Sequence, residues 1–235
     1  MSLFATLFPL LCWFAYNNGV GLVERHYPSL SAIMSLQRRR WVANAAMHET
    51  PYDAILAGNL MGSVSFLAST SALLVLANFA AFGQLPNLMQ TLGSIAFDHP
   101  YAPIEVQIHF AVLLTIFVLS FFAFTLSLRQ FNHFCIMLGA LGRHGEATEP
   151  EIDAIARLNA MAAKNFNNGL RAYYFAVAMV AWFASPWLAI AVSLATVGFI
   201  IHREFFSTAH RLAASVAISA NRRDAPNEPV ADDQL

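Results

Sequence analysis

The feature that most constrains this chain is a run of thirty residues without a charged side chain, Ala172–Ile201, which Arg171 and Arg203 close at its two ends. As one straight helix this run would be roughly 45 Å long, whereas the hydrocarbon core of a bilayer is about 30 Å thick. Pro186 lies in the middle of the run. Proline removes a helical hydrogen-bond donor and disfavours helical backbone at the preceding residue. The run therefore forms either one kinked membrane helix or a hairpin of two short helices that turns at Ser185-Pro186-Trp187.

Composition indicates an integral membrane protein. The 235 residues are 57% hydrophobic and 11% charged, whereas soluble domains carry about 25% charged residues. Three further segments are apolar and long enough to cross a bilayer, namely Leu3–Val23, Leu60–Phe82 and Phe110–Leu128. Backbone polar groups in hydrocarbon must be satisfied internally, so these segments are predicted to be helices. The lipid bilayer is the expected partner, and the net charge of −1 gives no basic bias that would indicate a nucleic-acid partner.

Two polar segments also have helical signals. Ser29–Met47 carries the run Arg38-Arg39-Arg40-Trp41, and basic residues beside an aromatic ring are typical of helices at a membrane interface. A second helix is predicted to begin at Thr148-Glu149-Pro150-Glu151, where a capping threonine precedes an acidic first turn. We expect both to be interfacial helices on the cytoplasmic side.

Local signals also suggest where other segments begin and end. Thr50 as a cap and Pro51 at the first helical position would extend the second membrane helix to Pro51–Phe82. The tail 221–235 contains two prolines and four acidic residues and is predicted to be disordered in the cytoplasm. Residues 1–220 are then a single transmembrane helical domain.

Basic residues indicate the orientation, because they accumulate in cytoplasmic loops. None precedes the first span and none lies in the loop 83–105. A hairpin at the proline places all thirteen Lys and Arg residues on one side, whereas a single crossing splits them nine to four. We therefore predict an all-α bundle of three single spans plus a C-terminal helical hairpin. The expected location is a bacterial inner membrane, with the N-terminus outside and the C-terminus in the cytoplasm.

The hairpin makes a geometric prediction about its two arms. Fifteen residues separate Arg171 from Pro186, and eighteen separate Pro186 from Glu204. In antiparallel arms these two charged residues lie within one helical turn of each other at the cytoplasmic end. We expect an ion pair between them, which one straight helix could not form.

Polar and charged residues gather at the predicted inner ends of the spans. One interpretation is a cytoplasmic cluster that binds an anion or a lipid headgroup. The alternative is interfacial anchoring and ion pairing between helices, as charges at helix ends commonly provide. The candidate binding residues are Arg129, Asn132, His133, Arg171, Arg203 and Glu204.

Motifs for catalysis or cofactor binding are not found in the sequence. The eight histidines form no pair at metal-ligand spacing on a span. No nucleophile-elbow, metalloprotease or glycine-rich phosphate-binding pattern occurs. We expect no metal, no cofactor and no catalytic residue, and Cys12 and Cys135 are expected to be free thiols.

The second span begins with small residues, Gly58-x-x-x-Gly62, and small residues let membrane helices approach closely. Either this face packs within the bundle, or it contacts a second copy of the chain or a partner membrane subunit.

Several stretches are similar to one known family. SFLAST at Ser65–Thr70, FTLSLRQFNHFCIMLGA at Phe124–Ala140, NGLRAYYFAVAMVAWFASPW at Asn168–Trp187 and HREFFSTAHRL at His202–Leu212 resemble the domain of unknown function 599 family. These are multi-pass membrane proteins of bacteria and plants, and the resemblance covers about residues 10–215. It implies the membrane topology, supplies no reaction, and adds Tyr174 to the candidate residues beside Arg129, Asn132, Arg171, Arg203 and Glu204.

The expected function is that of a non-catalytic accessory or interaction subunit of the membrane. The alternatives are a transporter or channel component that works as an oligomer, a lipid- or anion-binding protein that uses the cytoplasmic cluster, and a membrane enzyme with His133 as a proton carrier.

Overall fold

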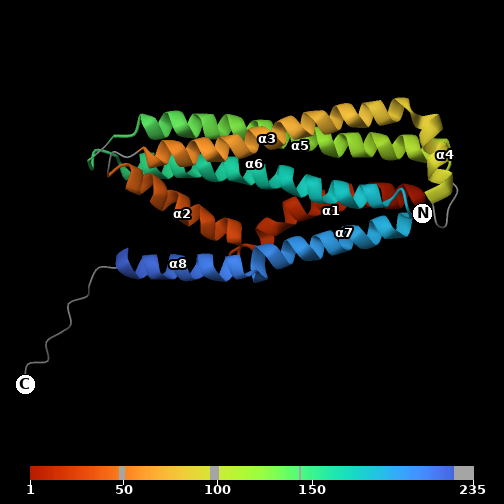
Figure 1. Ribbon diagram of the computed structural model, residues 1–235. Helices are drawn as coiled ribbons and strands as arrows, with labels where there is room; N and C mark the ends of the chain where they lie inside the picture. Colours follow the sequence, from red (N-terminus) through yellow and green to blue (C-terminus); the bar gives the residue numbers. More distant parts are fainter. Residues whose placement is uncertain (48–50, 96–100, 143, 225–235) are drawn as a thin grey trace, which may run out of the picture.

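Three helices longer than a bilayer is thick set the length of the molecule. In the computed structural model, α3 (Tyr52–Gly83), α5 (Pro103–Gly139) and α6 (Glu149–Ala181) contain 32, 37 and 33 residues. At about 1.5 Å per residue they are roughly 48 to 56 Å long, against about 30 Å for a hydrocarbon core. They lie side by side along the whole bundle in Figure 1.

The structure describes residues 1–47, 51–95, 101–142 and 144–224. Within these ranges it is helical and contains no strand, which confirms the predicted all-α class. The remaining elements are α1 (Ser2–Val23), α2 (Leu30–Ala45), α4 (Leu85–Ile95), α7 (Pro186–Ile201), the π-helical turn η1 (His202–Phe206) and α8 (Thr208–Asp224).

Two shorter helices end halfway along the three long ones. α1 ends at Val23 and α7 at Ile201, and the chain continues from these points as α2 and α8 toward the far end (Figure 1). One half of the bundle is therefore completed by α1 and α7, and the other half by α2 and α8. The polar helix α2 and the polar half of α6 extend the bundle along its axis beyond the level where α1 and α7 end.

The uncharged run forms the predicted hairpin. α6 ends at Ala181, α7 begins at Pro186, and the two helices pack against each other. Pro186 occupies the first turn of α7, where a missing N–H costs nothing. The connection is Trp182–Ser185, slightly earlier than the predicted turn, and the single kinked helix is excluded.

Among the residues that the structure describes, four helices are long and apolar enough to cross a membrane, Ser2–Val23, Tyr52–Gly83, Pro103–Gly139 and Pro186–Ser219. The first arm of the hairpin, Ala172–Ala181, does not qualify, because it continues a helix whose other half is polar. One face of this arm is covered by protein, since Ala172, Phe175 and Met179 are all buried, whereas Val177 and Val180 are exposed. In the apolar half of the bundle, this arm therefore packs against α1, α5 and α7.

The end of the bundle near α4 is closed by aromatic side chains. Trp182 is fully buried and stacks on His109 with ring centroids 4.1 Å apart. His109 Nε2 is 3.0 Å from the carbonyl oxygen of Met179, and the Tyr101 hydroxyl donates to the Trp182 carbonyl at 2.6 Å. His109 is therefore a residue that packs the core, and both of its ring nitrogens have a hydrogen-bond partner.

The predicted helix ends can be compared with the structure. Ser29 caps α2 by accepting from the backbone N–H of Ala32, and Thr148 with Glu151 forms the capping box of α6. Thr50 lies outside the described residues. α8 continues to Asp224, and residues 225–235 of the predicted tail lie outside the described residues.

Hydrogen bonds across the core fix the register of α5 against α6. The hydroxyl of Ser120 donates to the Gly169 carbonyl at 3.1 Å, and that of Ser127 donates to the Ala162 carbonyl at 2.7 Å. The approach is close because position 169 has no side chain: a Cβ there would lie 2.8 Å from the Phe124 ring. The Phe124 ring is fully buried and contacts the rings of two further aromatic residues.

Replacing Gly169 by alanine is therefore expected to destabilise the bundle by about 1–3 kcal/mol, because the buried Phe124 ring must shift. The matched control is Gly198→Ala on α7, an exposed position where an added Cβ meets nothing within 4 Å. Reversible unfolding in detergent micelles measures both variants. Equal stability of the two variants would show that the close approach of α5 and α6 is not required.

Candidate functional site

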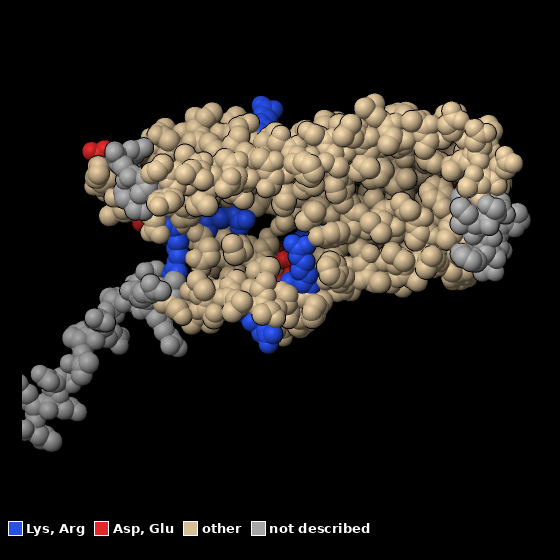
Figure 2. All heavy atoms as spheres, viewed as in Figure 1, with Lys and Arg blue, Asp and Glu red and all other residues tan. Residues whose placement is uncertain are grey.

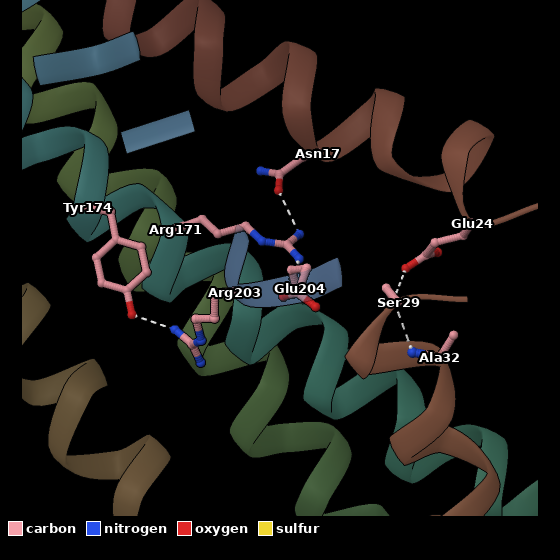
Figure 3. A network of polar contacts seen from close by, with 8 residues as sticks. All are labelled: Asn17, Glu24, Ser29, Ala32, Arg171, Tyr174, Arg203 and Glu204. Carbon is pink, nitrogen blue, oxygen red and sulfur yellow. Dashed lines mark hydrogen bonds and ion pairs between the residues drawn. The ribbon is translucent and has the colours of Figure 1, made fainter. Parts of the chain in front are cut away.

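The centre of the polar network is Arg171, which lies on α6 and is buried. Its Nη2 donates to Glu204 Oε1 at 3.2 Å, and its Nη1 donates to Asn17 Oδ1 at 3.1 Å (Figure 3). The guanidinium also lies 4.9 Å from the centre of the Tyr16 ring, within the range of a cation–π interaction. Arg171 thus ties α6 to α1 and to the turn after α7.

The carboxylate partner comes from the π-helical turn η1, His202–Phe206. π-helical turns are rare and often occur at functional sites. Glu204 points toward Arg171, while its neighbour Arg203 donates from Nη1 to the hydroxyl of Tyr174 at 2.7 Å (Figure 3). Arg203 is exposed, so this second contact lies on the outside of the hairpin.

The predicted ion pair between Arg171 and Glu204 is confirmed. The two side chains retain only 10% and 11% of their solvent exposure. Removing one partner of a buried pair leaves an uncompensated charge, which costs about 3–5 kcal/mol. The pair therefore makes the antiparallel register of the hairpin strongly preferred over any shifted one.

The structure divides the predicted cluster into two groups. Arg171, Tyr174, Arg203 and Glu204 come together around the hairpin, as described above. The candidates on α5, which are Arg129, Asn132 and His133, are all exposed.

The distance between the two groups follows from the register of α5 and α6. The two serine hydrogen bonds to α6 place Arg129 beside Ala160. Ala160 is eleven residues, or roughly 16 Å along the helix, from Arg171. One compact cluster of all seven candidates is therefore not formed.

A polar cavity of about 450 Å³ lies beside Arg171, between α1, α2 and α6. Figure 2 shows a hollow on this face with basic side chains next to it. We use "polar cavity" for this space, whose polar lining residues are Asn17, Asn18, Glu24, Ser31, Ser35, Arg38, Lys164, Asn167 and Arg171. The lining has three cations and one carboxylate, and because Arg171 is paired with Glu204, the remaining charge is +1.

Two of these cations are not neutralised. Among the residues that the structure describes, neither Arg38 nor Lys164 has an ion-pair partner. The carboxylate of Glu24 instead accepts a hydrogen bond from the Ser29 hydroxyl (Figure 3). Arg39, next to Arg38, contacts Glu149 and Asp153 at the start of α6 and does not line the cavity.

The sequence does not single out Asn17, Arg38 or Lys164 as site residues. Arg38 stands out only as part of a basic run, and Asn17 only as an asparagine in the last turns of an apolar helix. Their convergence depends on α2 folding back along α6, which the sequence does not show.

Within the described ranges no group of three or more His, Cys, Asp or Glu side chains could hold a metal ion.

The comparison with known proteins agrees with this architecture. Residues 4–209 match the family described as "Protein of unknown function, DUF599", and the chain belongs to this family. No curated protein and no solved structure shows significant similarity to the chain. The family carries no assigned function.

Substitutions at the buried pair should show strong coupling. Arg171→Gln and Glu204→Gln are each expected to lower the free energy of unfolding by about 3 kcal/mol, because each strands a buried charge. The double variant should lose clearly less than the sum of the single losses. Unfolding in detergent measures the cycle, with Arg203→Gln as the exposed control, expected to lose less than about 1 kcal/mol. Additive losses would contradict a direct interaction.

Proposed function

We propose that this membrane protein binds an oxyanion of the phosphate class in the polar cavity and catalyses no reaction. The observation that carries the proposal is the presence of Arg38 and Lys164 in one cavity, where neither has an ion-pair partner among the described residues. Each of these cations is compensated when an anion enters the cavity.

The state of Arg38 supports this proposal. The residue is half-buried on α2, outside the candidate membrane spans. Burial lowers the pKa of its guanidinium from the usual value, because loss of hydration penalises the charged form. Arginine nevertheless stays protonated in proteins, so its desolvation cost remains uncompensated until an anion is bound.

The donor set of the cavity matches a phosphate group. A guanidinium presents planar pairs of N–H donors that suit phosphate oxygens, and an ammonium adds a point charge. Asn17 Nδ2 is a buried donor without a hydrogen-bond partner among the described residues. Ser31 and Ala32 in the first turn of α2 also line the cavity, where the helix dipole is positive.

The wider role that we propose is that of an accessory or interaction subunit. A face for a partner is supported by Gly58 and Gly62 on α3, which are both exposed and where an added Cβ meets nothing within 4 Å. These two glycines therefore do not serve packing within this bundle. Small residues on an outward face allow close approach of another membrane helix, either from a second copy or from a partner subunit.

We further propose that the cavity faces the cytoplasm of a bacterial inner membrane. Basic side chains on the face shown in Figure 2 lie in its middle and toward the α2 and α8 end, not toward α4. Because basic residues favour the cytoplasmic side, this distribution supports an N-terminus outside and a C-terminus inside. Cytoplasmic oxyanions would then reach the site directly.

The topology can be tested with reporter fusions. Alkaline phosphatase, which is active only outside the cytoplasm, should be inactive when fused after Leu235, and a fluorescent reporter there should be active. The same fusions at the N-terminus should give the opposite result. An active phosphatase at the C-terminus would refute the proposed orientation.

Binding of inorganic phosphate by the detergent-solubilised protein tests the proposed function. Arg38→Gln and Lys164→Gln are each expected to weaken the affinity about tenfold, since a charge-assisted hydrogen bond contributes about 1.5–3 kcal/mol. Arg39→Gln, which changes the neighbouring cation outside the cavity, should leave the affinity unchanged. The measurement is the rise of Tm with phosphate concentration, at constant ionic strength set with chloride. Equal affinities for all four proteins would show that the cavity is not the binding site.

A further inference from the structure

A second space, mostly apolar, lies next to the polar cavity. It has a volume of about 690 Å³ and is bordered by the end of α1, the turn η1 and the start of α8. We call it the apolar groove; the residues that matter here are Tyr16, Gly19, Val23, Ile201, Phe205 and Phe206. The proposed oxyanion does not require such a space, so the groove calls for a separate explanation.

The groove and the cavity share one wall. Val20 lines both spaces. Tyr16 lines the groove, and its ring lies against the guanidinium of Arg171, which lines the cavity. A molecule with an anionic end and an apolar end could therefore occupy both spaces at once.

Both spaces are lined by residues near the end of the candidate span of α1. The candidate span of α1 ends at Val23, and the candidate span Pro186–Ser219 is interrupted by the π-helical turn η1 directly after Ile201; Val23 and Ile201 both border the groove. The ends of membrane spans mark the boundary between hydrocarbon and headgroups. The polar cavity continues from this level along α2 and α6, where the lining becomes charged.

We propose that the ligand of this protein is an anionic phospholipid, whose phosphate headgroup occupies the polar cavity while an acyl chain lies in the apolar groove. The inference rests on the proposed oxyanion binding and adds the class of ligand. Charge complementarity with Arg38 and Lys164 selects an anionic headgroup, and the apolar groove beside the cavity, which shares Val20 with it, selects a lipid over a free phosphate.

Two glycines on α1 separate the contributions of the two spaces. Gly19 lines the groove and Gly21 lines the cavity, and an added Cβ at either position meets nothing within 4 Å. Gly19→Leu therefore fills the groove, and Gly21→Leu fills the cavity, with the same change two residues apart on one helix. Gly198→Leu on α7, which lines neither space, is the control.

The experiment compares glycerol 3-phosphate with dioctanoyl phosphatidic acid, which share a phosphate but differ in acyl chains. Protein is reconstituted in phosphatidylcholine nanodiscs, and affinities are taken from the rise of Tm with ligand concentration. In G19L the affinity for the diacyl ligand should fall at least tenfold, while that for glycerol 3-phosphate is unchanged. G21L should weaken both ligands at least tenfold, and G198L neither.

The outcomes separate this inference from the proposed function. If glycerol 3-phosphate binds and G19L leaves the diacyl affinity unchanged, the groove holds no acyl chain and the lipid proposal is overturned, while oxyanion binding stands. If neither ligand binds, both proposals fail. If G19L instead dissociates a dimer, measured by light scattering, and keeps the diacyl affinity, the groove belongs to a second copy of the chain and the lipid proposal is likewise overturned.

Discussion

Arg171 and Glu204 come from the two arms of the C-terminal hairpin, and both are almost completely removed from solvent. A charge in this position without its partner would be strongly destabilising. The pair therefore strongly favours one register of α6 against α7, and it holds the turn η1 against α6. Through Asn17 and the Tyr16 ring, the same guanidinium also positions α1. The side chain of Arg171 thus holds together α1, α6 and η1, which border the cavity or the groove.

The mismatch between helix length and bilayer thickness determines where the site lies. α3, α5 and α6 are longer than a hydrocarbon core, so a large part of each extends beyond it. α1 ends at Val23 and α7 at Ile201, where the π-helical turn η1 follows. Because two of the five helices end while three continue, side chains at this level are not covered on all sides. The polar cavity and the apolar groove occupy this transition.

Much of the fold could be predicted, because it depends on local sequence signals and on the number of residues between them. The antiparallel hairpin and its ion pair followed from the distribution of arginines and from the distances of Arg171 and Glu204 to Pro186 in the chain. The cavity could not be predicted, because it depends on which face of α2 meets α6. Arg38 and Arg39 are adjacent in the sequence, yet one lines the cavity and the other pairs with the start of α6. The burial of Ala172, Phe175 and Met179 by neighbouring helices is likewise a property of the packed bundle, not of the segment.

The ion pair also explains how a cation can stand beside an apolar groove. The Tyr16 ring separates the groove from Arg171, and Phe205 follows Glu204 directly in the chain. An unpaired guanidinium at this wall would attract water and disfavour an acyl chain. Glu204 neutralises it without lining the polar cavity, so the positive charge that remains for a headgroup belongs to Arg38 and Lys164. Because Arg171 is paired and Arg38 and Lys164 are not, the site is basic in the polar cavity and apolar in the groove. Recognition of an anionic lipid requires both properties.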